Sequence, residues 1–93
     1  MNTLIVGCGR VGAHLARVLE QEGHDVSILA EREGDLELLM TLENYSFQGY
    51  SRVGSPIDVD MLRAAGIENC DAVVAVCPQD NINIMVAQIA ERL

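Results

Sequence analysis

Residues 4–12 (LIVGCGRVG) join a short apolar run directly to a segment of helical periodicity. They contain a complete GxGxxG pattern in the strand–turn–helix context that this pattern requires. The first glycine turns the chain, the second lets the backbone approach a pyrophosphate, and the third allows a helix to pack closely on a strand. The helix would present free N–H groups and the positive end of its dipole to an anion. The stretch therefore predicts a nucleotide-binding loop made of Gly7, Cys8, Gly9, Arg10, Val11 and Gly12.

This loop has alternative interpretations. The glycines could be required only for close packing and not for binding a ligand. Arg10 could pair with a phosphate, or it could be an ordinary exposed arginine of the first helical turn. Cys8 is best interpreted as a small filler residue within the loop.

Short apolar runs alternate with helix-period segments at a pitch of a little over twenty residues, which predicts βα units on a parallel sheet. The expected strands cover residues 4–6, 26–29, the later part of 45–53, and 72–76, the last with the apolar composition of a central strand. We therefore expect one α/β domain over residues 1–93, a Rossmann-like doubly wound parallel sheet with strand order 3-2-1-4. Its four βα units are two strands short of the ~6 of a full dinucleotide fold. The outer edge of the fourth strand should thus be uncovered unless another copy or chain covers it.

Apolar residues at helical spacing predict a helix after each strand. The second helix should begin near residues 34–35, and Asp58 is a candidate N-cap for the third. Pro78 and Asp80 mark the start of the fourth helix. The residues expected to face the core are Val11, Leu15, Val18 and Leu19 in the first helix, Leu36, Leu39 and Met40 in the second, Met61, Leu62 and Ala65 in the third, and Ile82, Met85, Val86, Ile89 and Leu93 in the fourth. Those expected to face away from it are Arg17, Glu20 and Gln21.

Composition excludes several classes of protein. The net charge is −8 and all six basic residues are arginines, which argues against nucleic acid as a partner. The absence of lysine excludes a Walker phosphate loop and a Schiff-base enzyme. Cys8, Cys70 and Cys77 have no CxxC spacing, so we expect a reducing cytoplasm and neither a disulfide framework nor a zinc site. No apolar run approaches the ~20 residues that cross a bilayer, so direct membrane insertion is not expected.

Dinucleotide sites usually carry an acidic residue at the end of the second strand, where it hydrogen-bonds the ribose. Here that strand ends in Ala30, Glu31 and Arg32. If Leu29 is the last buried residue, Ala30 occupies the acidic position and Glu31 comes one place late. Glu31 could still reach the ribose by a small backbone shift, whereas Arg32 raises the alternative of a 2′-phosphate. These residues do not decide which cofactor is bound.

The histidines and Cys77 are expected to have structural rather than catalytic roles. His14 and His24 have no partner at triad or metal-ligand spacing, so we expect surface or helix-end positions. Cys77 is expected to pack at the carboxyl end of the fourth strand, beside the crevice. The methionines expected in the core are Met40, Met61 and Met85.

The second half of the chain carries a more specific pattern than the glycine loop. Residues 54–58 (GSPID), 65–67 (AGI), 70–74 (CDAVV) and 80–83 (DNIN) occur in this order and spacing. Together with the glycine loop they resemble the regulator of potassium conductance domain, also called the TrkA N-terminal (RCK/KTN) domain, over nearly the whole chain.

This resemblance implies a sensor rather than an enzyme. Such domains dimerise, bind NAD(H) or adenine nucleotides, and gate a membrane potassium channel or transporter from the cytoplasm. Helix four, with its apolar stripe, is a candidate for the interface. Carried over by position, phosphates would be held by Gly7, Gly9, Arg10 and Gly12, the ribose by Ala30, Glu31 and Arg32, and the adenine by Gly54, Ser55 and Pro56, with the crevice closed by Val76, Cys77 and Pro78.

Two residues depart from the pattern of the family. Ala30 and Ser55 stand where the family usually has aspartate. NADP, ATP, ADP, AMP or no ligand therefore remain alternatives to NAD(H). Two other hypotheses stay open, namely the cofactor-binding part of an NAD(P)-dependent oxidoreductase and a degenerate Rossmann domain kept for assembly.

Overall fold

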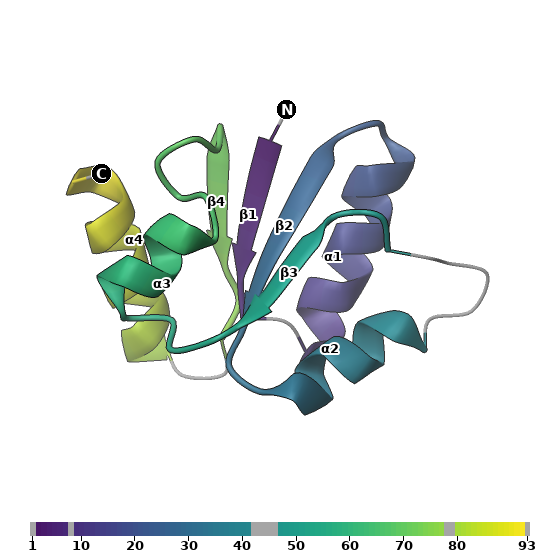
Figure 1. The fold of residues 1–93 in the computed structure, drawn as a ribbon, viewed down its shortest axis with the longest axis horizontal. Helices are drawn as coiled ribbons and strands as arrows, with labels where there is room; N and C mark the ends of the chain where they lie inside the picture. The colour runs from purple at the N-terminus through teal and green to yellow at the C-terminus, as the bar shows by residue number, and fades with distance from the viewer. Residues whose placement is uncertain (1, 8, 42–46, 78–79, 93) are drawn as a thin grey trace.

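The computed structural model describes residues 2–7, 9–41, 47–77 and 80–92. Strands and helices alternate along the chain, as predicted (Figure 1). Their order is β1 (Asn2–Val6), α1 (Gly9–Gln21), β2 (Asp25–Ala30), α2 (Glu33–Met40), β3 (Tyr50–Val53), α3 (Val59–Ala64), β4 (Ala72–Ala75) and α4 (Asp80–Arg92). Helix α1 begins at Gly9, inside the glycine motif, rather than at Val11.

The four strands form one parallel sheet in the order β3-β2-β1-β4, as predicted. Ile5 of β1 pairs with Ile28 of β2 on one side and with Val74 of β4 on the other. Residues 72–76 have the composition of a fully buried strand, and that expected burial was wrong. Among the described strands β4 pairs with β1 alone, and its residues are half-buried.

Helices cover both faces of the sheet, with α1 and α2 on one face and α3 and α4 on the other (Figure 1). Alternating strand residues divide between these two layers because successive side chains point to opposite faces. The layer under α1 and α2 contains Ile5, Ala13, Ala16, Val26, Ile28, Ala30 and Leu39. The layer under α3 and α4 contains Leu4, Val6, Leu29, Leu62, Ala65, Ile67, Cys77 and Val86.

The buried face of α1 differs from the predicted one. Its buried residues are Gly12, Ala13 and Ala16, with Leu15 and Leu19 packed beside them. Val11 and Val18 were expected in the core, but they are 66% and 45% exposed. Small side chains let the helix axis approach the sheet closely, and this close approach decides which residues are buried.

Three further core expectations need correction. Met61 packs against the core as expected, but Met40 is 59% exposed and Met85 is 42% exposed. Arg17, expected to face solvent, is half-buried, and its Nε atom is buried. In α4 the residues Ile82, Val86 and Ile89 pack on the core as predicted, whereas Leu93 lies outside the described residues.

Helices α1 and α4, with 13 residues each, are too short for a bilayer. At 1.5 Å per residue such a helix is ~20 Å long, against the ~30 Å of a hydrocarbon core. Within the described ranges no helix has the length and apolar character to cross a membrane.

Candidate functional site

The carboxyl ends of the four parallel strands meet at one edge of the sheet (Figure 1). Backbone hydrogen bonds continue across this edge beyond the strands. The N–H groups of Gly7, Val76 and Gly54 donate to the carbonyls of Leu29 (2.7 Å), Val6 (2.9 Å) and Ala30 (2.9 Å), respectively. These bonds bring together the four segments that the sequence assigns to the site. The chain reverses its order between β1 and β4, which is where open α/β sheets form a ligand crevice.

Gly7 and Gly12 are positions where only glycine fits. Gly7 has φ +89°, and a Cβ there would lie 2.8 Å from Sγ and 2.9 Å from N of Cys77. A Cβ on Gly12 would lie 2.8 Å from the carbonyl oxygen of Gly7. Gly7 therefore turns the chain against β4, and Gly12 packs α1 onto the end of β1. These are the structural roles that the motif predicts for its first and third glycines.

Gly9, in contrast, borders open space. It has φ +68°, and a Cβ there would meet no described atom within 4 Å. It begins α1, whose first backbone N–H groups have no intrahelical acceptors. The first turn carries no acidic side chain, and Arg10 on it is exposed. An anion in this space would accept from the amides and lie at the positive end of the helix dipole. Cys8 lies outside the described residues.

Cys77 packs beside the glycine turn. Its Sγ lies 3.7 Å from the carbonyl oxygen of Val6, and its side chain is buried. Burial raises the pKa of the Cys77 thiol to about 12, and a side-chain hydrogen bond to Glu31 together with the negative charges of Glu31 and Asp35 adds to the rise. The thiol is therefore protonated at neutral pH and fills space, as the sequence suggested. Pro78, the next predicted site residue, lies outside the described residues.

Asn83 is a site residue that sequence reasoning missed. Its Oδ1 accepts from the Cys77 N–H at 2.8 Å, and its Nδ2 donates to the Cys77 carbonyl at 2.9 Å. The side chain thus fixes the chain as it leaves β4. The sequence signal was an asparagine near the start of the helix that follows this strand, within the 80–83 pattern.

The end of β2 is arranged differently from the expectation. Ala30, not Leu29, is its last buried residue and belongs to the layer under α1 and α2. Glu31 is half-buried with a buried Oε1 atom, and its carboxylate lies close to the Cys77 thiol. Arg32 is exposed. The acidic side chain at this end of the sheet is therefore that of Glu31, one residue after Ala30.

The turn after β3 forms the remaining wall. Gly54 lies against the side chain of Met61, which occupies the space that a Cβ would need. Ser55 is exposed, and its Oγ accepts from the Ile57 N–H at 3.4 Å. Pro56 is buried. Asp58 caps α3 as predicted, because its Oδ1 accepts from the Asp60 N–H at 2.9 Å.

This arrangement places hydrogen-bonding groups of two kinds at one edge of the sheet. A Cβ on Gly9 would meet no described atom within 4 Å, and the first N–H groups of a helix such as α1 are suited to phosphate oxygens. The carboxylate of Glu31 has a buried oxygen, which is a hydrogen-bond acceptor. The histidines do not take part in this arrangement. His14 is exposed on α1, and His24 lies at the opposite edge of the sheet, 4.0 Å from Glu22. In the described ranges no three His, Cys, Asp or Glu side chains are grouped to hold a metal.

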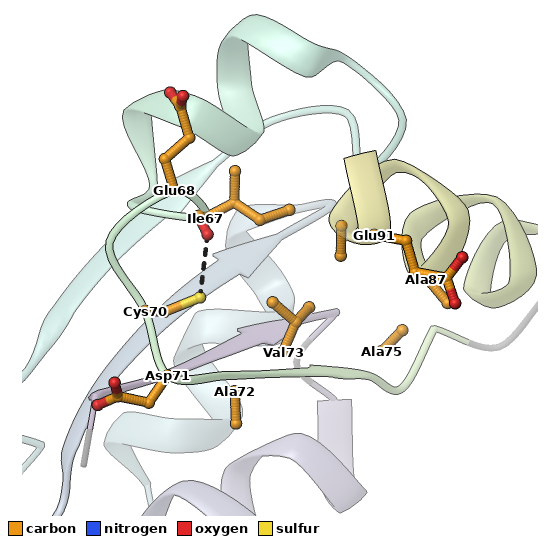
Figure 2. Close-up of a pocket in the computed structure, with 10 residues that line it drawn as sticks. Ile67, Glu68, Cys70, Asp71, Ala72, Val73, Ala75, Ala87 and Glu91 are labelled. Carbon is orange, nitrogen blue, oxygen red and sulfur yellow. Dashed lines mark hydrogen bonds between the residues drawn. The ribbon is translucent and has the colours of Figure 1, made fainter. Parts of the chain in front are cut away.

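A separate cavity of about 440 Å³ lies along the free edge of β4, between the α3–β4 segment and α4 (Figure 2). Figure 2 shows Ile67, Val73 and Ala75 on its apolar wall. Its polar side chains are the carboxylates of Glu68, Asp71 and Glu91. These groups would repel phosphate, so this cavity is not suited to a phosphate-bearing ligand.

Comparison with known proteins gives consistent results. The TrkA-N domain model matches residues 3–93. The "Trk system potassium uptake protein TrkA" of Streptomyces coelicolor is 41% identical over all 93 residues of this chain. The "Trk system potassium uptake protein TrkA homolog" of Pyrococcus abyssi is 37% identical over the same length. This chain spans only 40% and 39% of these two proteins.

A solved structure shares the fold. The Shewanella denitrificans Kef CTD, determined in an AMP-bound form, superposes with a TM-score of 0.79 at 21% sequence identity. The match covers 99% of this chain and 52% of that one. At this identity the likeness concerns the arrangement of strands and helices.

Proposed function

This chain belongs to the TrkA-N domain family, and from that premise we propose that it is a nucleotide-binding regulatory domain of a membrane potassium-transport system. The observation that carries the proposal is the position of Gly9, which begins α1 at the carboxyl edge of the sheet and whose Cβ would meet no described atom within 4 Å. A domain with the same fold has been solved with AMP bound, which supports an adenine nucleotide as the ligand class. NAD(H), NADP, ATP and ADP are the other candidate ligands.

The residues proposed to hold the nucleotide are those at the carboxyl edge of the sheet. The phosphates would lie against Gly7, Gly9, Arg10, Val11 and Gly12 with their neighbour Cys8, and the adenine against Gly54, Ser55 and Pro56. Val76, Cys77 and Pro78 would close the crevice at β4. The ribose would meet the end of β2, at Ala30, Glu31 and Arg32.

We propose a transporter or channel subunit as the partner, because the relatives are named as potassium uptake proteins. Regulation requires that the nucleotide bind more tightly to one arrangement of the assembly than to another. A second copy of this domain is the simplest element with two arrangements. The domain acts by binding in this proposal, and no residue of the crevice is assigned a catalytic role.

Thermal unfolding with AMP, ADP, ATP, NAD⁺, NADH and NADP⁺ tests the nucleotide proposal. A ligand at ~100 times its dissociation constant stabilises a domain by about 2.7 kcal/mol, which raises the Tm of a chain of this size by on the order of 10 °C. We expect such a rise with at least one member of the panel. No rise with any of them would overturn the proposal.

Gly9→Ala and Gly23→Ala form a matched pair for locating the site. Both glycines have positive φ, +68° and +91°, and a Cβ on either meets no described atom within 4 Å. Each substitution should therefore cost about 1–2 kcal/mol of stability. Gly23 precedes β2, at the opposite edge of the sheet. Only Gly9→Ala should weaken nucleotide binding, because its methyl group enters the proposed phosphate space. Equal binding by both variants would place the ligand elsewhere.

The second candidate function is that of a degenerate Rossmann domain kept for assembly. Ala30 and Ser55 favour it because they lack the carboxylates that the family usually has at these two positions. It predicts normal folding without any nucleotide response.

Deleting the protein from cells and measuring potassium uptake tests the transport assignment separately. Unchanged uptake and an unchanged response to nucleotide levels would contradict a regulatory role.

A further inference from the structure

The open edge of the sheet at β4 borders the cavity of about 440 Å³. Among the described strands β4 pairs with β1 alone. Val76 donates its N–H to the Val6 carbonyl at 2.9 Å. Since the backbone groups of successive residues point to opposite sides of a strand, Val73 and Ala75 direct their N–H and carbonyl groups to the open edge. This edge therefore offers a short row of backbone donors and acceptors to another strand.

Contacts within the chain close both ends of this row. At the carboxyl end, the side chain of Asn83 bonds the N–H and the carbonyl of Cys77 at 2.8 and 2.9 Å. At the amino end, the Asp71 N–H donates to the Asn2 carbonyl at 2.7 Å, and Asp71 Oδ2 accepts from the Asn2 N–H at 2.8 Å. The open part of the edge is thus residues 73–75, which suits a short extended segment.

The cavity beside this edge has apolar walls. Val73 and Ala75 line it from β4, and Ile67 lines it from the α3–β4 segment (Figure 2). On α4 it is bordered by Ala87 and Ala90, whose small side chains leave the space open. Its volume lies within the range of ligand-binding clefts, about 300–1,000 Å³. Alternate side chains of a strand added to β4 would point toward this space.

The charges around the cavity indicate which segment fits. Its ionisable side chains other than the thiol of Cys70 are the carboxylates of Glu68, Asp71 and Glu91, all of them exposed. Glu68 forms an ion pair with Arg63 at 3.4 Å, whereas the structure gives Asp71 and Glu91 no ion pair with the residues that it describes. A second copy paired here would bring like charges together, while a basic segment would be attracted.

We propose that the open edge of β4 binds an extended segment of a membrane transport protein, rich in lysine or arginine, by strand addition. Main-chain hydrogen bonds to residues 73–75 would provide affinity, an apolar side chain would enter the cavity, and basic side chains would meet the carboxylates. Cytoplasmic segments of membrane proteins carry an excess of lysine and arginine. The choice of partner rests on the proposed regulatory function. Ile84 and Met85, exposed on α4, do not line the cavity.

Amide hydrogen exchange and peptide titrations on the whole chain test the inference. The probe is a capped heptapeptide in which two lysines precede and two lysines follow a valine–alanine–valine centre. One control peptide has glutamates in place of the lysines. The other keeps the lysines and has prolines in place of the valines, because proline cannot donate to a strand.

The two readouts have separate expected results. In the free protein the amides of Val73 and Ala75 should exchange faster than that of Val76, which is bonded to β1. The lysine peptide should slow exchange at Val73 and Ala75 by about tenfold or more. Each control peptide should bind about tenfold more weakly than the probe, because it lacks either the charge or the main-chain donors.

Two pairs of variants locate the surface. Ala87 lines the cavity, whereas Gln88, its exposed neighbour on α4, does not. Ala87→Phe should weaken the lysine peptide by more than about tenfold, because the ring fills the space that the peptide needs, and Gln88→Phe should change it less than about twofold. Glu91→Gln should weaken it about twofold to threefold, as expected for an exposed charge pair. Glu37→Gln, on α2, should leave it unchanged.

Several outcomes would overturn the inference. Exchange at Val73 and Ala75 that is already slow in the free protein would show that its own chain or a second copy covers the edge. Equal binding by the lysine and proline peptides would reduce the interaction to charge attraction. No binding by the lysine peptide would exclude the site. Each of these results leaves nucleotide binding standing, and the thermal unfolding panel decides that function separately.

Discussion

Asn83 holds the backbone of Cys77 with both ends of its side-chain amide. The Cys77 N–H donates to Asn83 Oδ1 at 2.8 Å, and Asn83 Nδ2 donates to the Cys77 carbonyl at 2.9 Å. Cys77 in turn borders Gly7, the first glycine of the loop. A residue near the start of α4 thus fixes the strand end against which the glycine turn packs.

Asn83→Ala should therefore destabilise the fold. It removes two hydrogen bonds and leaves polar backbone groups of a buried residue unpaired, at a cost of about 1–3 kcal/mol. Urea unfolding measures this loss. Gln88→Ala, at an exposed position of the same helix, is the control and should change stability by less than about 0.5 kcal/mol. Equal effects of the two substitutions would show that the amide bridge does not stabilise the domain.

Gly7→Ala should be far more damaging than Gly23→Ala. Both positions have positive φ, which costs alanine about 1–2 kcal/mol. At Gly7 the new methyl group would also meet Sγ and N of Cys77 at 2.8 and 2.9 Å, and such overpacking adds about 1–3 kcal/mol. Chemical unfolding of the two variants side by side measures the difference. A loss at Gly7 no larger than that at Gly23 would contradict the close packing of the turn on β4.

The Cys77 thiol should make the domain less stable at alkaline pH. Its pKa is raised from 9.0 to about 12 by burial and by the carboxylates of Glu31 and Asp35. Between these values the folded thiol keeps its proton while the unfolded thiol ionises, so the free energy of unfolding falls as pH rises. The stabilising contribution is complete below pH 9 and is lost toward pH 12.

Cys77→Ala isolates this effect. The variant has a lower stability at pH 8 because it leaves a small cavity, but its stability should fall less steeply between pH 9 and pH 11. The limiting slope for one thiol is about 1.4 kcal/mol per pH unit. Urea titrations at several pH values give both slopes. Parallel curves for the two proteins would contradict the raised pKa.

Helix α4 presents Ile84 and Met85 to solvent. We expect this surface to join two copies of the domain. Ile84→Glu should weaken self-association about 10- to 100-fold, because burying an isoleucine contributes about 1.5–3 kcal/mol. Sedimentation equilibrium measures the association constant, with Gln88→Glu as the control on the same helix. A wild-type chain that stays monomeric would contradict the expectation.

The sequence predicted the parts of the fold that depend on local pattern. Alternating strands and helices, the glycine turn and the Asp58 cap follow from residues close together in the chain, whereas the order of the sheet followed from the type of fold that this alternation indicates. The buried face of α1 did not follow, since Val11 and Val18 are larger and more apolar than Ala13 and Ala16. Helical periodicity identifies a helix, but how closely it approaches the sheet depends on the glycine contact at Gly12.

The features of the candidate site also fall into those predicted from local sequence and those decided by the tertiary structure. Local sequence identified the segments, because glycines, a turn and strand ends are encoded by neighbouring residues. Only the tertiary structure decided that Asn83 holds Cys77, that Ala30 is buried, and that the carboxylate of Glu31 lies close to the Cys77 thiol. These relationships join β2, β1, β4 and α4 across the sheet. They depend on parallel pairing between distant segments, and that pairing sets which side chains meet at the carboxyl edge.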